Sequence, residues 1–210
     1  MLSVKAVEAS TLELIKSLQN KPYLKDLYLA GGTALALHLD HRRSIDIDLF
    51  SNFDFDAAAL LEKIHQDFSF QLFLTAPNTL KGRIEKINVD ILAHRYPLLA
   101  EPEEIYGIFL LSVPDIIAMK LNAISTSGQR SKDYIDIFFL LDQYSVREML
   151  RFYQMKYGQE HVGHVLKSLL YFEDVDLADW PVLISNKELK WKTVQKRIEK
   201  AVLDYVKDQK

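Results

Sequence analysis

Residues 29–50 constrain this chain more than any other stretch, because they place two carboxylates inside an apolar segment. The alternation of Ser44–Phe50 predicts a β-strand with Asp46 and Asp48 on one face and apolar side chains on the other. Alternate residues of a strand share a face, so the two carboxylates are expected roughly 6.5–7 Å apart. Like charges held that close on a half-buried strand are costly unless something neutralises them. The pattern therefore predicts a cation site.

A Gly-Gly pair upstream of this strand favours a phosphate ligand. Gly31 and Gly32 end an apolar run that reads as a strand over 25–30, and they precede a predicted short helix over 33–39. Backbone N–H groups at such a helix start can bind phosphate, and glycine permits close approach. The pair alone is also compatible with a plain turn.

A third carboxylate completes the set. Asp90 lies in the apolar run 87–93, which also reads as a strand. Mg²⁺ prefers carboxylate and phosphate oxygens, and Mn²⁺ is the other candidate. Two such ions about 3.5–4 Å apart would clamp the attacking and leaving oxygens of a phosphoryl displacement. The acids therefore predict a metal site that acts on a phosphorylated substrate.

Composition limits the remaining possibilities. The 210 residues suffice for one large or two small domains. Because the chain has no cysteine, disulfides, thiolate zinc sites and a cysteine nucleophile are excluded. The first residues lack the pattern of a signal peptide, and no apolar run is long enough to span a bilayer, so we expect a cytoplasmic protein with no membrane partner. The net charge of -3 leaves a local basic groove open.

Periodicity divides the chain into two halves and predicts an α+β protein. The first half, 1–96, alternates helices with strands and is expected to form a mixed β-sheet flanked by helices. The second half, 97–210, is expected to be all-helical after a boundary region at 96–113. The predicted helices are 3–20, 33–39, 54–68, 114–125, 132–144, 146–157, 160–172 and 188–208, and the predicted strands are 25–30, 44–50, 70–74, 79–85 and 87–93.

The helical half contains charged residues in an unusually apolar setting. Asp133 and Asp136 are i, i+3 neighbours on one face of a predicted helix rich in aromatic and aliphatic residues. Lys120, Arg130 or Lys132 is a candidate partner for these acids. Two interpretations stay open: a buried ion pair that locks two helices together, and a cationic contact to phosphate.

Further basic residues have a functional and a plain interpretation each. Arg42 and Arg43 precede the Asp-rich strand and either contact a triphosphate or RNA, or lie in a solvated turn. Ser44 either supports that strand by a hydrogen bond or simply begins it. Two larger basic groups either face nucleic acid or are solvated surfaces. The first consists of Lys81, Arg83 and Lys86, and the second of Lys187, Lys190, Lys192, Lys196, Arg197 and Lys200.

The segment from Gly31 to Phe50 resembles the AbiEii/AbiGii-type nucleotidyltransferase toxins of the polymerase β-like nucleotidyltransferase superfamily. The pattern is Gly-Gly-Thr-Ala-Leu-Ala-Leu, six residues, then Ser-Ile-Asp-Ile-Asp-Leu-Phe, followed by a later Asp. Residues 112–141 resemble the family's Lys…Arg…(Lys/Arg)-Asp-x-x-Asp motif. One departure is Ser127, where many relatives have arginine before the glycine.

The resemblance implies a nucleotidyltransferase fold and a role for each matched residue. Catalytic roles fall to Asp46, Asp48, Asp90 and Lys120, and the three acids would bind the metal. Contacts to the nucleoside triphosphate (NTP) would come from Gly31, Gly32, Thr33, Arg43, Ser44, Arg130, Lys132, Asp133 and Asp136. The implied reaction transfers a nucleoside monophosphate to an acceptor such as the 3′ end of a tRNA.

The resemblance also implies a biological role. Such a protein would be the toxin of a toxin–antitoxin or phage-defence pair, with a cognate antitoxin as partner. Transfer to a protein side chain instead of RNA stays open. The alternative function is a non-catalytic module that keeps this fold to bind a nucleotide or a protein, and retention of all three acids argues against it.

Overall fold

The structure is a computed structural model that describes residues 5–209. The chain forms two compact units, 1–112 and 113–210. Each unit has its own core and is described by itself below.

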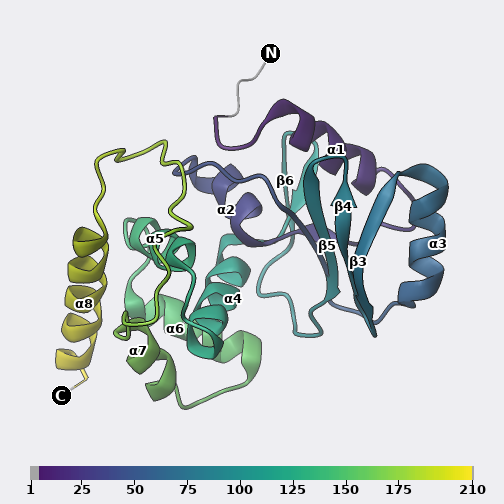
Figure 1. Cartoon of the computed structure of the whole chain (residues 1–210). Coiled ribbons are helices and arrows are strands. Elements are labelled where there is room, and N and C mark those ends of the chain that lie inside the picture. The colour runs from purple at the N-terminus through teal and green to yellow at the C-terminus, as the bar shows by residue number, and fades with distance from the viewer. Residues whose placement is uncertain (1–4, 210) are drawn as a thin grey trace. The chain divides into compact units, whose positions relative to one another are not determined.

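Within residues 5–112, the first unit contains three helices and a seven-stranded sheet (Figure 1). The helices are α1 (Ala9–Gln19), α2 (Gly31–Leu39) and α3 (Ala57–Asp67). The strands are β1 (Tyr28–Leu29), β2 (Ile47–Ser51), β3 (Phe70–Ala76), β4 (Thr79–Ile84), β5 (Ile87–Ala93), β6 (Glu103–Ile105) and β7 (Ile108–Leu110).

The sheet is mixed, with the order β3-β4-β5-β2-β1-β7-β6. β2 pairs with β5 and β1 with β7 in parallel, and the remaining neighbours are antiparallel. The middle strand β2 buries Ile47 and Leu49 completely. Figure 1 shows α3 beside the edge strand β3, where the ring of His65 bonds to the carbonyl of Phe70. The strands β2 and β5, which carry Asp48 and Asp90, are therefore interior strands of the sheet.

Two short strands place the end of the first unit later than residue 96. Residues 103–105 and 108–110 form a hairpin, and Leu110 lies beside Leu29 in the parallel pair of β7 with β1. The segment 97–112 thus completes the sheet, whereas the sequence had assigned it to the helical half. Strands of only three residues, Glu-Glu-Ile and Ile-Phe-Leu, give too short a pattern to be recognised from periodicity.

The second unit is helical, as expected. Its helices are α4 (Val113–Thr126), α5 (Ser131–Leu140), α6 (Val146–Tyr157), α7 (Gly163–Leu169) and α8 (Trp191–Lys207). The helix α6 begins with a capping box in which Ser145 and Glu148 satisfy each other's backbone N–H groups. The core is built from apolar side chains of α4, α5 and α8, including Ile117, Ile135 and Ile198. The α+β architecture predicted from the sequence is confirmed.

No helix within residues 5–209 is both long enough and apolar enough to cross a membrane.

Candidate active site

The first turn of α2 lies against the Asp-rich strand. Gly31 has a φ of +65°, and a Cβ atom there would be only 2.2 Å from Oδ2 of Asp48. The N–H of Ala30 donates to the carbonyl of Asp48 at 2.8 Å, which ties the turn to β2. Glycine is therefore required at position 31 for both backbone conformation and space. The predicted Gly-Gly turn and the predicted Asp-x-Asp strand form one local unit.

Sheet register brings Asp90 beside Asp48. The parallel pair of β2 with β5 makes these two residues direct neighbours, and neighbouring strands lie about 4.8 Å apart. On the other side of β5, Lys81 of β4 is the register partner of Asp90. The ammonium of Lys81 donates to Oδ2 of Asp90 at 2.6 Å. The three side chains form a first polar row across the sheet, and Lys81 offsets part of its negative charge.

A second polar row lies two residues away. Asp46 immediately precedes β2, and its Oδ1 accepts from the side-chain amide of Asn88 at 3.0 Å. Asn88 in turn accepts from Nε of Arg83 at 3.2 Å. Sequence reasoning named Arg83 only as part of a basic strand and missed Asn88. The signal was available, because Asn88 precedes Asp90 by the two residues that keep it on the same face.

Thr33 supports the segment that leads into β2. Its hydroxyl lies 2.9 Å from the hydroxyl of Ser44 and also donates to the carbonyl of Asp46. Thr33 is buried, with 1% of its surface exposed. Ser44 also anchors its own backbone, since its N–H donates to the carbonyl of Ala6. In this structure Thr33 and Ser44 hold the carboxylate strand in place, which is the supporting role considered for Ser44 from the sequence.

The arginine beside the Gly-Gly turn is Arg42. A Cβ atom on Gly32 would lie 2.4 Å from Nη2 of Arg42, so the guanidinium fills the space that the glycine leaves. Arg42 is 2% exposed, whereas Arg43 is exposed to solvent. The sequence-based set contained Arg43, and the structure brings Arg42 to the turn.

In the helical unit, Lys120 forms a buried triad with the two motif acids. Its ammonium lies 2.6 Å from Asp133 and 2.8 Å from Asp136, and all three side chains are at most 8% exposed. The triad joins α4 to α5. Burial, helped by the charge of Asp133, raises the pKa of the neighbouring Tyr134 to about 12. The buried ion pair, one of the two interpretations left open by the sequence, is therefore present.

The other two basic residues of the helical motif lie at the start of α5. Arg130 is exposed and pairs through its backbone with Asp176 in an isolated bridge. Lys132 forms an ion pair with Asp179. Both acids belong to the segment between α7 and α8, so Lys132 and the backbone at Arg130 fasten that segment to α5. No sequence pattern indicated these partners, because they lie more than forty residues further along the chain.

The carboxylates suit a divalent cation by their chemistry. Asp46, Asp48 and Asp90 offer only oxygen atoms, which a hard cation prefers; Asp48 and Asp90 lie on strands of the sheet, and Asp46 immediately precedes one. Within 5–209, no three His, Cys, Asp or Glu side chains are gathered closely enough to form a metal site. In this structure Asp46 accepts a hydrogen bond from Asn88, and Asp90 accepts one from Lys81. Convergence on a cation would exchange these bonds for metal ligation.

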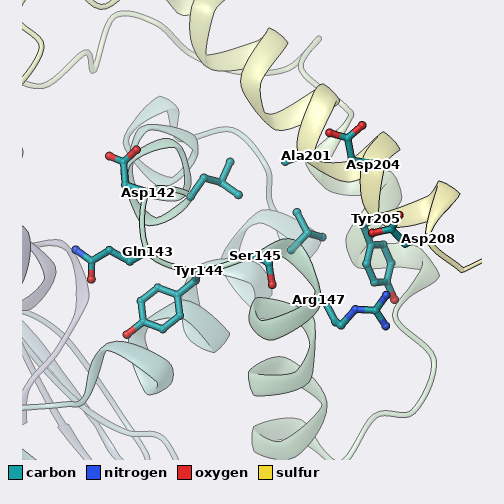
Figure 2. A pocket seen from close by; sticks show the side chains of 11 residues that line it. Asp142, Gln143, Tyr144, Ser145, Arg147, Ala201, Asp204, Tyr205 and Asp208 are labelled. Atoms are coloured by element: carbon teal, nitrogen blue, oxygen red, sulfur yellow. The ribbon is translucent and has the colours of Figure 1, made fainter.

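A cavity of about 460 Å³ in the helical unit lies apart from the motif residues (Figure 2). It is formed by the turn between α5 and α6 and by the last turns of α8. Asp142, Asp204 and Asp208 line it together with Arg147, whose guanidinium lies 5.6 Å from the ring centre of Tyr205. None of the residues predicted for the site lines this cavity.

Comparison with known proteins matches nearly the whole chain to one family. The family model described as "Nucleotidyl transferase AbiEii toxin, Type IV TA system" matches residues 13–97 and 69–209. A protein of Aquifex aeolicus (strain VF5), aq_aa25, is 30% identical over 214 residues, which cover 99% of this chain and 100% of that protein.

Two solved structures have a similar fold. MenT4, a nucleotidyltransferase toxin from Mycobacterium tuberculosis H37Rv, is 16% identical with a TM-score of 0.56, over 93% of this chain and 84% of that one. JHP933 from Helicobacter pylori is 15% identical with a TM-score of 0.51, over 98% and 100% of the two chains. At these identities the likeness supports the fold assignment.

Proposed function

Since the chain belongs to the AbiEii nucleotidyltransferase toxin family, we propose that it transfers a nucleoside monophosphate from an NTP to RNA. The chain is a nucleotidyltransferase, as the resemblance predicted. The RNA acceptor, with a tRNA 3′ end as the favoured one, and the need for Mg²⁺ are the specific parts of the proposal. The observation that carries it is the row of Asp48, Asp90 and Lys81 beside the Gly31 turn.

The proposed metal ligands are Asp46, Asp48 and Asp90. A bound Mg²⁺, or Mn²⁺, would neutralise triphosphate charge and polarise the phosphorus under attack. Support comes from the donor chemistry of the three carboxylates and from the sheet that fixes their strands. Thr33 and Ser44 keep the segment before β2 in position, and Arg42 adds positive charge behind the Gly-Gly turn.

The proposed reaction is an in-line displacement at the α-phosphorus. A hydroxyl oxygen of the RNA forms a bond to that phosphorus, and the bond to the oxygen that bridges to the β-phosphorus breaks. Pyrophosphate leaves with this oxygen. Asp90 is proposed to accept the proton of the hydroxyl.

The proposed biological role is that of the toxin of a type IV toxin–antitoxin pair. It rests on the description of the matching family. We expect expression of the chain to arrest growth, expression of the Asp48→Asn variant to be tolerated, and an antitoxin encoded nearby to restore growth. Growth arrest of equal strength by both forms would contradict a toxicity that depends on catalysis.

Incorporation of labelled nucleotide tests the reaction directly. The protein is incubated with total RNA, MgCl₂ and each of the four α-labelled NTPs in turn. We expect label in RNA from the wild type, none from Asp48→Asn, and full activity from Asp26→Asn, which alters an exposed acid of the same unit. Label in protein but not in RNA would refute the proposed acceptor. Absence of label in both would refute the transfer itself.

A further inference from the structure

Three lysines at the beginning of α8 lie on an exposed surface without acidic partners. Lys190 directly precedes the helix, and Lys192 and Lys196 lie in its first two turns. All three are exposed, and among residues 5–209 no acidic side chain forms an ion pair with them. Lys192 and Lys196 lie opposite the buried stripe of α8, because residues four apart share a helix face. We call Lys190, Lys192 and Lys196 the lysine face.

This arrangement opposes helix stability. Like charges four residues apart, such as Lys192 and Lys196, repel each other. Positive charge in the first turn is also unfavourable next to the positive end of the helix dipole. Local stability therefore does not explain the lysine face. Apolar packing of Val194, Ile198 and Val202 must hold α8 in spite of it.

The lysine face is next to the motif helix α5. Trp191, between Lys190 and Lys192, lies edge-on to Tyr134 with ring centres 5.7 Å apart. Tyr134 directly follows Asp133 of the buried triad. The ring of Trp191 also contacts Phe172 and Trp180, so the start of α8 is held firmly against this part of the helical unit.

Charge changes sign along α8. Its last turns contribute Asp204 and the following Asp208 to the acidic lining of the cavity in Figure 2. Lys200 is neutralised by Asp204, four residues on. The lysine face therefore lies in the half of α8 that contacts α5, and Asp204 lies in the other half.

We propose that the lysine face binds the phosphodiester backbone of the RNA acceptor. The proposal rests on the proposed function, since it assigns a binding surface to the same substrate. The lysines contact phosphates and not bases, so binding is independent of sequence and strongly dependent on salt.

Salt dependence of RNA binding tests the proposal. The probe is a 5′-labelled single-stranded RNA with a free 3′ hydroxyl, followed by fluorescence anisotropy over a range of KCl concentrations. Each lost phosphate contact lowers the slope of log K against log salt by about 0.7 for a single strand. Lys192→Gln/Lys196→Gln should therefore reduce the slope by about 1.4 and weaken binding about 25-fold at roughly 0.1 M salt. Glutamine keeps the helix propensity of both positions.

A matched control separates local contacts from total charge. Lys25→Gln/Lys63→Gln removes two exposed lysines from the first unit and should leave the slope unchanged. Equal slopes for the α8 variant and the wild type would overturn the proposal, including the case in which the lysine face binds an acidic protein. Equal losses in both double variants would also overturn it.

Failure of this inference is distinguishable from failure of the proposed function. If the α8 variant labels RNA as efficiently as the wild type at every RNA concentration, the lysine face is not the acceptor site, although transfer to RNA stands. The expected result is a raised KM for RNA with an unchanged rate at saturating RNA. If the wild type labels no RNA, the proposed function has failed independently of the anisotropy result.

Discussion

Replacing Gly31 with alanine should disable the enzyme without unfolding it. Two effects add at this position. The backbone has a φ of +65°, where an L-residue with a side chain costs about 1–2 kcal/mol. The new Cβ would also lie 2.2 Å from Oδ2 of Asp48, while ordinary contacts begin at 3.4 Å. The carboxylate or the turn must therefore move by 3.4 − 2.2 = 1.2 Å.

A displacement of this size is large for a catalytic group. Misplacing reacting groups by about 1 Å can cost about 100-fold in rate, so we expect kcat/KM for nucleotide incorporation to fall by about that factor. The free energy of unfolding, measured with urea, should fall by at least about 1–2 kcal/mol, which is the backbone cost alone. Gly163→Ala is the control, because a Cβ there meets nothing within 4 Å. A folded Gly31→Ala variant with wild-type activity would refute the idea that Asp48 depends on this close approach.

Three further predictions concern other parts of the molecule. Gly32→Ala should leave the free energy of unfolding in urea nearly unchanged, because the gain in helix propensity offsets the cost of shifting the end of the Arg42 side chain. It should raise the KM for the NTP if Arg42 assists phosphate binding. Lys120→Met should lower the free energy of unfolding by about 3–5 kcal/mol, because it leaves two buried carboxylates without a cation. Lys132 pairs with the half-exposed Asp179, so Lys132→Met should cost less than about 1 kcal/mol. Similar losses in the two variants would contradict the triad's structural role. The pKa of Tyr134 is raised to about 12, so the neutral hydroxyl contributes fully to folding stability below pH 10, and this contribution is lost as the pH rises toward 12. Alkaline unfolding of the wild type compared with Tyr134→Phe measures this loss.

Local patterns in the sequence were sufficient to predict the candidate metal-binding acids, but not the residues that lie beside them in the sheet. Alternation predicted the strand with Asp48, and it overestimated that strand's length, because Ile45 is 55% exposed and β2 begins only at Ile47. Which strands pair, and in which register, depends on contacts far apart in the chain. The neighbours Asn88 and Lys81 became apparent only once β2, β5 and β4 were placed side by side.

Burial of charged residues was also beyond the sequence. Two consecutive arginines, Arg42 and Arg43, have the same local pattern, and only the space over Gly32 distinguishes the buried one. In the structure the positive φ explains the glycine at position 31, and the close approach of Arg42 explains the one at position 32. In the helical unit the apolar surroundings of Asp136 indicated that its carboxylate needs a cation, but they left a buried ion pair and a phosphate contact open, and the structure shows the ion pair.

The two interpretations of Lys120 now differ in what they cost. Its ammonium is already engaged by Asp133 and Asp136 at 2.6 and 2.8 Å, inside a core where water does not replace a lost partner. A phosphate that bound Lys120 would have to draw it away from at least one buried carboxylate, or bind while both ion pairs persist. The first route leaves a buried carboxylate without its ammonium partner, which is costly. A direct contact is therefore favoured only if the triphosphate supplies more negative charge than it displaces. The triad therefore fixes the geometry of α4 and α5 first, and any contribution of Lys120 to nucleotide binding is limited by the stability of that pairing.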